Sequence, residues 1–119
     1  MKKKVLVVDD EKEIVDFLEK FLRRLDITVM KAVSGGEAVE LCKKDSPDCV
    51  FLDIQMPDKD GLTVLQEIID LNAALKVIMI TGKEKLEFQE KAKKIGAIDY
   101  ITKPLDLSDL NEKVKAYLS

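Results

Sequence analysis

The sequence predicts an α/β domain in which one five-stranded parallel sheet is covered by helices on both faces. Short apolar runs alternate with amphipathic segments through all 119 residues, and this alternation is typical of parallel strands joined by right-handed helical crossovers. Three of the runs are continuously apolar, as expected for strands buried on both faces. No linker or second pattern interrupts the alternation, so residues 1–119 are expected to form a single domain.

The expected strands are rich in Val, Ile and Leu and contain no proline. They are placed at 4–9, 27–32, 48–53, 76–81 and 98–102. The second run mixes polar and apolar residues, which favours a position at the edge of the sheet.

The first two helices are indicated by apolar residues that recur at helical spacing. The buried face of the first consists of Ile14, Phe17, Leu18, Phe21, Leu22 and Leu25. The second opens at Ser34, and Glu37 three residues later completes the spacing of a capping box. Its buried residues are Ala38, Val39, Leu41 and Cys42.

The remaining three helices follow the third, fourth and fifth strands. One begins after the turn-rich segment 57–61 and carries Leu62, Leu65, Ile68, Ile69 and Leu71. The next, at about 84–95, has a weak apolar stripe of Leu86, Phe88, Ala92 and Ile95. The last starts near Asp106, a suitable N-cap, and buries Leu107, Leu110, Val114, Tyr117 and Leu118.

Composition excludes several classes of function. The net charge of −3, with both signs interspersed, gives no electrostatic reason to expect nucleic acid or an anionic membrane as a partner. No apolar stretch approaches the roughly 20 residues of a membrane span, and the basic start lacks a long apolar signal region. A cytoplasmic location is expected. Cys42 and Cys49 are interpreted as small hydrophobic residues, and the absence of histidine argues against structural zinc.

Four of the apolar runs end in residues that bind a hard cation or phosphate. Asp9 and Asp10 follow the first run, Asp53 the third, Thr81 the fourth and Lys103 the fifth. Ligands of open α/β sheets bind beyond the carboxyl ends of the strands. Clustered carboxylates favour a divalent cation such as magnesium, the ammonium and hydroxyl suit phosphate, and an aspartate can be a phosphoryl acceptor. Each residue alone could be a helix cap or a turn former, but the repeated placement favours phosphoryl transfer.

These residues lie in segments that resemble the receiver domains of bacterial two-component response regulators, including the single-domain type of chemotaxis and sporulation. The matching segments are 5–11, 48–61, 78–82 and 100–105. The resemblance implies a flavodoxin-like, doubly wound sheet of order 2-1-3-4-5. It also implies phosphorylation of Asp53 by a sensor histidine kinase or a His-containing phosphotransfer protein. Such a domain promotes its own phosphorylation and dephosphorylation and is not an enzyme with a separate substrate.

The resemblance also implies a metal site and a phosphoryl site. The ligands of magnesium, with manganese as an alternative ion, would be Asp10, Asp53, the backbone carbonyl of Gln55 and, through water, Asp9. Thr81 and Lys103 would hold the phosphoryl oxygens. Lys103–Pro104 matches a cis peptide bond of the family.

Further roles follow from the same resemblance. Tyr100 would turn inward as Thr81 moves toward the phosphate, and the signal would pass to a downstream protein or output domain. The surface concerned consists of the helix at 84–95, the last strand and the last helix. Gln55 and Lys83 would line the path of the water that attacks the phosphoaspartate, and so tune its lifetime.

Two departures from the family pattern remove no chemical group. Lys59 stands where Met is common and is interpreted as a solvent-facing loop change. Gly82 replaces a common Ala and would leave the phosphate pocket more open. The chain fits a stand-alone regulator and one domain of a longer protein equally well.

Three alternatives were weighed. A hydrolase of the haloacid dehalogenase type would need an aspartate where Gln55 stands. A flavin carrier would lack the acidic edge, whose charge repels a flavin phosphate. A degenerate receiver that serves only for docking is disfavoured by the intact acidic set.

Overall fold

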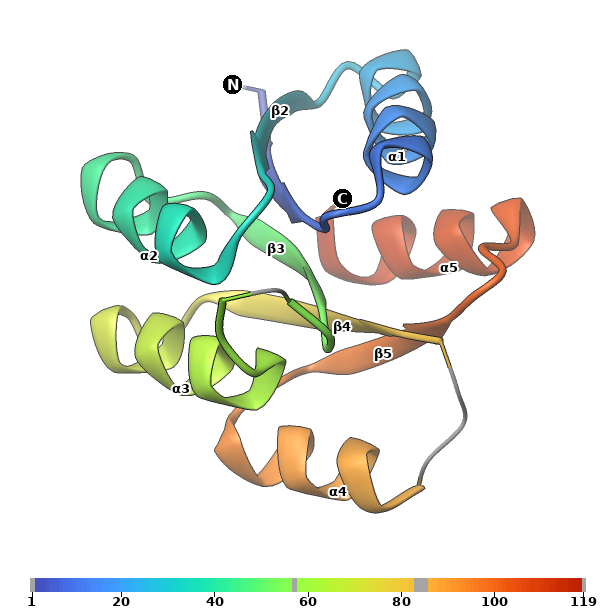
Figure 1. The fold of residues 1–119 in the computed structure, drawn as a ribbon. Helices are drawn as coiled ribbons and strands as arrows, with labels where there is room; N and C mark the ends of the chain where they lie inside the picture. The colour runs from blue at the N-terminus through green and yellow to red at the C-terminus, as the bar shows by residue number, and fades with distance from the viewer. Residues whose placement is uncertain (1, 57, 83–85, 119) are drawn as a thin grey trace.

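The computed structural model describes residues 2–56, 58–82 and 86–118, in which a five-stranded sheet lies between two layers of helices (Figure 1). The strands are β1 (Lys4–Val8), β2 (Thr28–Ala32), β3 (Cys49–Asp53), β4 (Lys76–Thr81) and β5 (Asp99–Thr102). The helices are α1 (Lys12–Arg24), α2 (Gly35–Lys44), α3 (Gly61–Leu71), α4 (Leu86–Ile95) and α5 (Leu107–Leu118). All strand pairs are parallel, and the order β2-β1-β3-β4-β5 confirms the predicted flavodoxin-like fold. Within the described ranges, no helix is long and apolar enough to cross a membrane.

The sheet divides the core into two apolar clusters, one beneath each layer of helices. Helices α1 and α5 cover one face of the sheet, and α2, α3 and α4 cover the other (Figure 1). Successive side chains of a strand point to opposite faces. Val5 and Val7 of β1 accordingly belong to the α1/α5 cluster, and Leu6 and Val8 to the other. Every residue of β3 is buried, because this strand is central and covered on both sides.

The predicted helix starts at Ser34 and Asp106 are confirmed by hydrogen bonds. Ser34 Oγ accepts from the Glu37 amide at 3.2 Å. The Glu37 carboxylate reaches back to the Val33 amide at 2.8 Å, one residue beyond its usual partner in a capping box. Asp106 Oδ1 accepts from the Ser108 amide at 2.8 Å at the start of α5.

Three leucines predicted to be buried are instead exposed. They are Leu25, Leu71 and Leu107, with 44%, 45% and 53% of their surface accessible. Each lies at or just beyond the end of a helix. Leu25 follows the last residue of α1, Leu71 is the last residue of α3, and Leu107 is the first residue of α5. Val15 and Val64, which the apolar spacing did not single out, occupy buried positions in their place.

Both cysteines are buried and unpaired, as predicted. Burial raises the pKa of the Cys42 thiol to about 11 and that of Cys49 to about 12. Both therefore stay protonated and act as small apolar side chains.

Candidate functional site

Three carboxylates meet where β1 and β3 end. Asp53 is the last residue of β3 and Asp9 directly follows β1, and the two neighbouring strands are in register with Val8 opposite Leu52. The side chains of Asp9 and Asp53 are almost fully buried, with 0% and 3% of the residue accessible, whereas Asp10 is exposed. One oxygen from each of the three carboxylates lies within 4.8 Å of the others.

One oxygen of Asp9 is buried without a hydrogen bond. Asp9 Oδ1 accepts from the Glu11 amide at 2.9 Å, but Oδ2 has no hydrogen-bond partner among the described residues. Lys103 Nζ lies 3.3 Å from Oδ2, which is an ion-pair distance without the geometry of a hydrogen bond. A buried carboxylate oxygen without a hydrogen bond is costly. The arrangement of oxygen donors therefore fits a hard divalent cation beside the three aspartates.

Lys103 is the positive charge of the site. Its amide donates to the Thr81 carbonyl at 2.8 Å, which extends the β4–β5 pairing and carries the side chain to the acidic edge. Lys103 Nζ lies 3.5 Å from Asp53 Oδ2 and 3.1 Å from Glu11 Oε1. The ammonium is thus shared between the buried aspartates and an exposed glutamate.

The surroundings shift the pKa of both Asp53 and Lys103. Burial raises the pKa of Asp53 to about 6; the Gln55 amide and Lys103 oppose this rise, and the charge of Asp9 adds to it. Partial burial alone would lower the pKa of Lys103, but its hydrogen bond to Glu11 and the charges of Asp53 and Asp9 raise it. Lys103 therefore stays cationic at neutral pH.

The other predicted site residues lie at varying distances from this cluster. The backbone amide of Gln55 donates to Asp53 Oδ1 at 3.2 Å, and Gln55 is an exposed residue. Thr81 is the buried last residue of β4. Tyr100 is half-buried on β5 and lines a small cavity under α4 together with Thr81. Lys83 lies outside the described residues.

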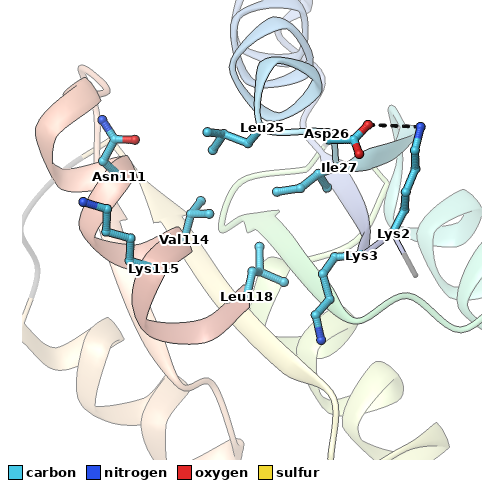
Figure 2. Close-up of a pocket in the computed structure, with 9 residues that line it drawn as sticks. All are labelled: Lys2, Lys3, Leu25, Asp26, Ile27, Asn111, Val114, Lys115 and Leu118. Atoms are coloured by element: carbon cyan, nitrogen blue, oxygen red, sulfur yellow. Dashed lines mark ion pairs between the residues drawn. The ribbon is translucent and has the colours of Figure 1, made fainter.

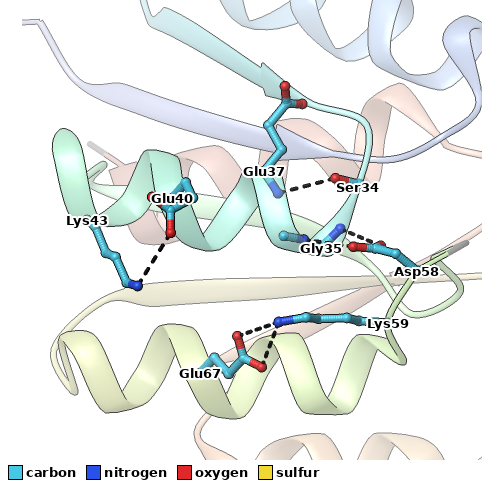
Figure 3. A network of polar contacts seen from close by, with 9 residues as sticks. Ser34, Gly35, Glu37, Glu40, Lys43, Asp58, Lys59 and Glu67 are labelled. Carbon is cyan, nitrogen blue, oxygen red and sulfur yellow. Dashed lines mark hydrogen bonds and ion pairs between the residues drawn. The ribbon is translucent and has the colours of Figure 1, made fainter.

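The polar contacts of the loop between β3 and α3 were not predicted from the sequence. Both oxygens of Asp58 accept hydrogen bonds from α2, at 2.9 Å from the Gly35 amide and 3.0 Å from the Gly36 amide (Figure 3). These two bonds hold the pKa of Asp58 below its usual value. Lys59, interpreted as a solvent-facing loop change, keeps 38% of its side chain exposed, and its Nζ lies 3.0 Å from both carboxylate oxygens of Glu67.

The predicted cis bond between Lys103 and Pro104 is confirmed. A Cβ placed at Gly82 would meet none of the described residues within 4 Å. Packing thus does not require glycine at this position.

Figure 2 shows a cavity of about 550 Å³ by the side chains that line it. It is lined by the segment that follows α1, the start of the chain and α5, including Leu25, Asp26, Val114 and Leu118. None of the three clustered aspartates lines it. This cavity is therefore separate from the carboxylate cluster.

A flavodoxin-like sheet with a carboxylate cluster and a lysine at its carboxyl edge defines a class of α/β domain suited to a divalent cation and a phosphoryl group. Residues 5–115 match the family described as the response regulator receiver domain. The regulatory protein VanR of Enterococcus faecium is 42% identical over 118 residues, which cover 99% of this chain and 51% of VanR. The chain thus spans about half the length of this relative.

Solved structures agree with the family match. A CheY-like receiver domain protein from Methanospirillum hungatei JF-1 has a TM-score of 0.93 at 32% identity, covering 98% of this chain and 93% of that one. A two-component response regulator from Clostridium difficile has a TM-score of 0.94 at 30% identity, covering 98% and 96%. The chain belongs to the family of response regulator receiver domains, which act in two-component signal transduction. This membership decides against the hydrolase and the flavin carrier.

Proposed function

We propose that residues 1–119 form one receiver domain that accepts a phosphoryl group on Asp53 from a sensor histidine kinase or a His-containing phosphotransfer protein. The observation that supports this most is the position of Asp53. Its carboxylate is almost fully buried at the end of the central strand, with Lys103 Nζ at 3.5 Å and two further aspartates beside it. The phosphohistidine must come from outside these 119 residues, because they contain no histidine.

In the proposed reaction, a carboxylate oxygen of Asp53 attacks the phosphorus of the phosphohistidine. The new O–P bond forms as the P–N bond breaks, and the imidazole leaves with the electron pair. Lys103 offsets part of the charge that accumulates when a phosphoryl group meets three carboxylates. When bound by Asp10, Asp53, the Gln55 carbonyl and, through water, Asp9, magnesium or manganese would neutralise further charge and orient the phosphoryl oxygens.

The switch would run from Thr81 to Tyr100. The Thr81 hydroxyl would bind a phosphoryl oxygen, and Tyr100 would turn toward the space left behind. This is supported by the small cavity that both residues line together with Phe88 and Ala92 of α4. The face of α4, β5 and α5 would then contact a downstream protein or output domain, with no direct contact to nucleic acid or membrane.

The phosphorylated state would also be limited in time by the domain itself. Gln55 and Lys83 would obstruct or orient the water that hydrolyses the phosphoaspartate. The domain would thus promote its own phosphorylation and dephosphorylation in the cytoplasm without acting on a separate substrate. Replacing Lys83 with alanine should shorten the half-life of the phosphoprotein, and an unchanged half-life would remove this residue from the proposal.

Incubation with magnesium and acetyl phosphate tests the function directly. The protein should gain about 80 Da, the mass of one phosphoryl group, on the peptide that contains Asp53. The Asp53→Asn variant should gain none. Undiminished labelling of that variant would overturn the assignment of Asp53, and an unlabelled wild-type protein would favour a docking module that accepts no phosphoryl group.

A further inference from the structure

We propose that Asp58 is a positioning residue for Asp53. By clasping the first turn of α2, its carboxylate holds residues 58–60 in place, and the bridge from Asp60 to Gln55 in turn fixes the carboxylate of Asp53. The inference rests on the proposed function of Asp53 as the phosphoacceptor. It assigns a role to a loop residue that is neither a metal ligand nor part of the phosphoryl pocket.

The clasp joins two segments that are far apart in the sequence. Asp58 accepts from the amides of Gly35 and Gly36, the first two residues of α2, from 23 and 22 residues away. The first amides of a helix lack partners within the helix, and a carboxylate there also interacts favourably with the helix dipole. Ser34 satisfies the Glu37 amide, so the first turn is capped once locally and twice from the loop (Figure 3).

Close packing supports the clasp. A Cβ at Gly35 would lie 2.5 Å from Val64 Cγ2 and 3.2 Å from Lys59 Cβ. The helix start can therefore approach α3 and the loop only because residue 35 has no side chain. Lys59, the neighbour of Asp58, is itself held on α3 by Glu67 at 3.0 Å. The tip of the loop is thus anchored to both helices.

The base of the same loop holds Asp53. Gln55 forms an antiparallel bridge with Asp60, and the Gly61 amide donates to the Ile54 carbonyl at 3.0 Å. The two ends of the loop, at 54–55 and 60–61, are therefore joined to each other. The first amide of the loop beyond Ile54, that of Gln55, donates to Asp53 Oδ1 at 3.2 Å.

This chain of contacts determines which oxygen of Asp53 is available. Oδ1 is occupied by the Gln55 amide, and Oδ2 is the oxygen that faces Lys103 at 3.5 Å. A single fixed orientation presents the same oxygen to each phosphoryl donor, which accelerates a transfer that depends on positioning. Releasing Asp58 frees the tip, lets the base of the loop move and disperses the orientations of Asp53.

The matched pair Asp58→Ala and Ser34→Ala tests the inference, because both variants remove a cap from the same turn of α2 and only the first releases the loop. In metal-free buffer, Asp58→Ala should speed amide hydrogen exchange at Gly35, Gly36 and Gln55. Its dissociation constant for magnesium should rise about tenfold, at the lower end of what supporting residues of metal sites contribute. Labelling by acetyl phosphate should slow by a similar factor.

Ser34→Ala should lower the melting temperature about as much as Asp58→Ala does. Amide exchange at Gln55 and the affinity for magnesium should stay unchanged in Ser34→Ala. Asp58→Asn, which keeps one acceptor oxygen, should be intermediate and provides a milder variant if alanine impairs folding. Wild-type exchange at Gln55 together with wild-type magnesium affinity in Asp58→Ala would overturn the inference. If Ser34→Ala lost as much exchange protection at Gln55 and as much magnesium affinity as Asp58→Ala, the inference would also be overturned, because the stability of α2 would then explain the effect. An unlabelled wild-type protein would instead refute the proposed function, while exchange at Gln55 would still report on the clasp.

Discussion

The Lys103 ammonium lies closer to Glu11 than to Asp53, with Nζ 3.1 Å from Glu11 Oε1 and 3.5 Å from Asp53 Oδ2. The Glu11 side chain is 59% exposed, whereas that of Asp53 is buried. A phosphoryl group on Asp53 would offer Lys103 a partner of higher charge. We therefore expect Glu11 to compete with an incoming phosphoryl group for Lys103.

Removing this competition should speed phosphorylation. Glu11→Gln keeps the size of the side chain and weakens its hold on Lys103. Because exposed ion pairs contribute little, we expect the initial rate of labelling by acetyl phosphate to increase only about two- to fivefold. Glu13→Gln is the matched control, since it makes the same charge change on the first turn of α1. A slower rate in Glu11→Gln, or an equal increase in the control, would contradict the role of Glu11.

The raised pKa of Asp53 makes stability depend on pH. Because burial raises this pKa to about 6 from 3.8, the folded protein binds a proton at a pH where the unfolded chain does not. The resulting stabilisation is full below about pH 3.8 and is lost as the pH rises through about 6. In metal-free buffer, the free energy of unfolding of the wild type, measured relative to that of Asp53→Asn, should therefore increase as the pH falls.

The size of this shift should be about 1 to 3 kcal/mol between neutral pH and pH ~4.5, from about 1.4 kcal/mol per pKa unit. Urea titrations at several pH values measure it. Asp58→Asn provides a contrast of opposite sign, because hydrogen bonds from Gly35 and Gly36 lower the pKa of Asp58. The loss of stability caused by Asp58→Asn should therefore become smaller as the pH falls. A wild-type advantage over Asp53→Asn that grows with pH would refute the prediction.

Asp10 is expected to matter for metal and not for the start of α1. The N-cap of α1 is Glu11, whose own side chain makes no capping hydrogen bond, and the Glu11 amide donates to Asp9. Asp10→Ala should weaken magnesium binding while slightly raising the melting temperature in metal-free buffer, because it relieves repulsion from Asp9 and Asp53. Calorimetry with and without magnesium measures both effects. An unchanged affinity would remove Asp10 from the ligand set.

Two glycines near the site should respond to alanine in opposite ways. A Cβ at Gly61 would lie 2.5 Å from the backbone of Ile54, so Gly61→Ala should destabilise by at least about 1 to 3 kcal/mol. At Gly82 a Cβ would touch none of the residues that the structure describes, and Gly82→Ala should be neutral or stabilise by up to about 1 kcal/mol through the unfolded state. Denaturant midpoints compare them, and similar midpoints for the two variants would contradict the packing argument.

Most of the fold could be predicted from the sequence because its strands are marked by strong local patterns. Runs rich in Val, Ile and Leu, three of them continuously apolar, located all five strands to within one residue at each end. The errors at Leu25 and Leu107 have one cause: helical spacing shows which side of a helix is apolar and does not show where the sheet beneath it ends.

The site was predictable to the extent that strand ends determine it. Asp9, Asp53 and Lys103 meet because parallel strands bring their carboxyl ends to one edge. Contacts made between loops and other elements carry no such local signal. Glu11 and Lys103 are 92 residues apart, and Asp58 reaches α2 through a loop whose course depends on the finished fold.

Phosphorylation should loosen or rearrange α4 and β5 more than any other part of the protein. Among the described side chains of α4, only Ala92 is buried, so we expect this part of the helix to be held less firmly than helices with several buried residues. Tyr100 of β5 lies beneath it, with Lys93 Nζ 5.7 Å from the centre of the ring. Movement of Tyr100 toward Thr81 would remove part of that contact and shift α4 between two packings.

Amide hydrogen exchange on the acetyl-phosphate-treated protein measures this effect. We expect the largest changes in exchange in α4 and β5. The control is Asp53→Asn treated with acetyl phosphate in the same way, which should show no change. Tyr100→Ala should reduce the changes in α4 while leaving labelling of Asp53 intact, because the ring transmits the signal and does not take part in the transfer. Changes confined to the loop 54–60 would mean that phosphorylation is felt only at the site and that α4 is not part of the output surface.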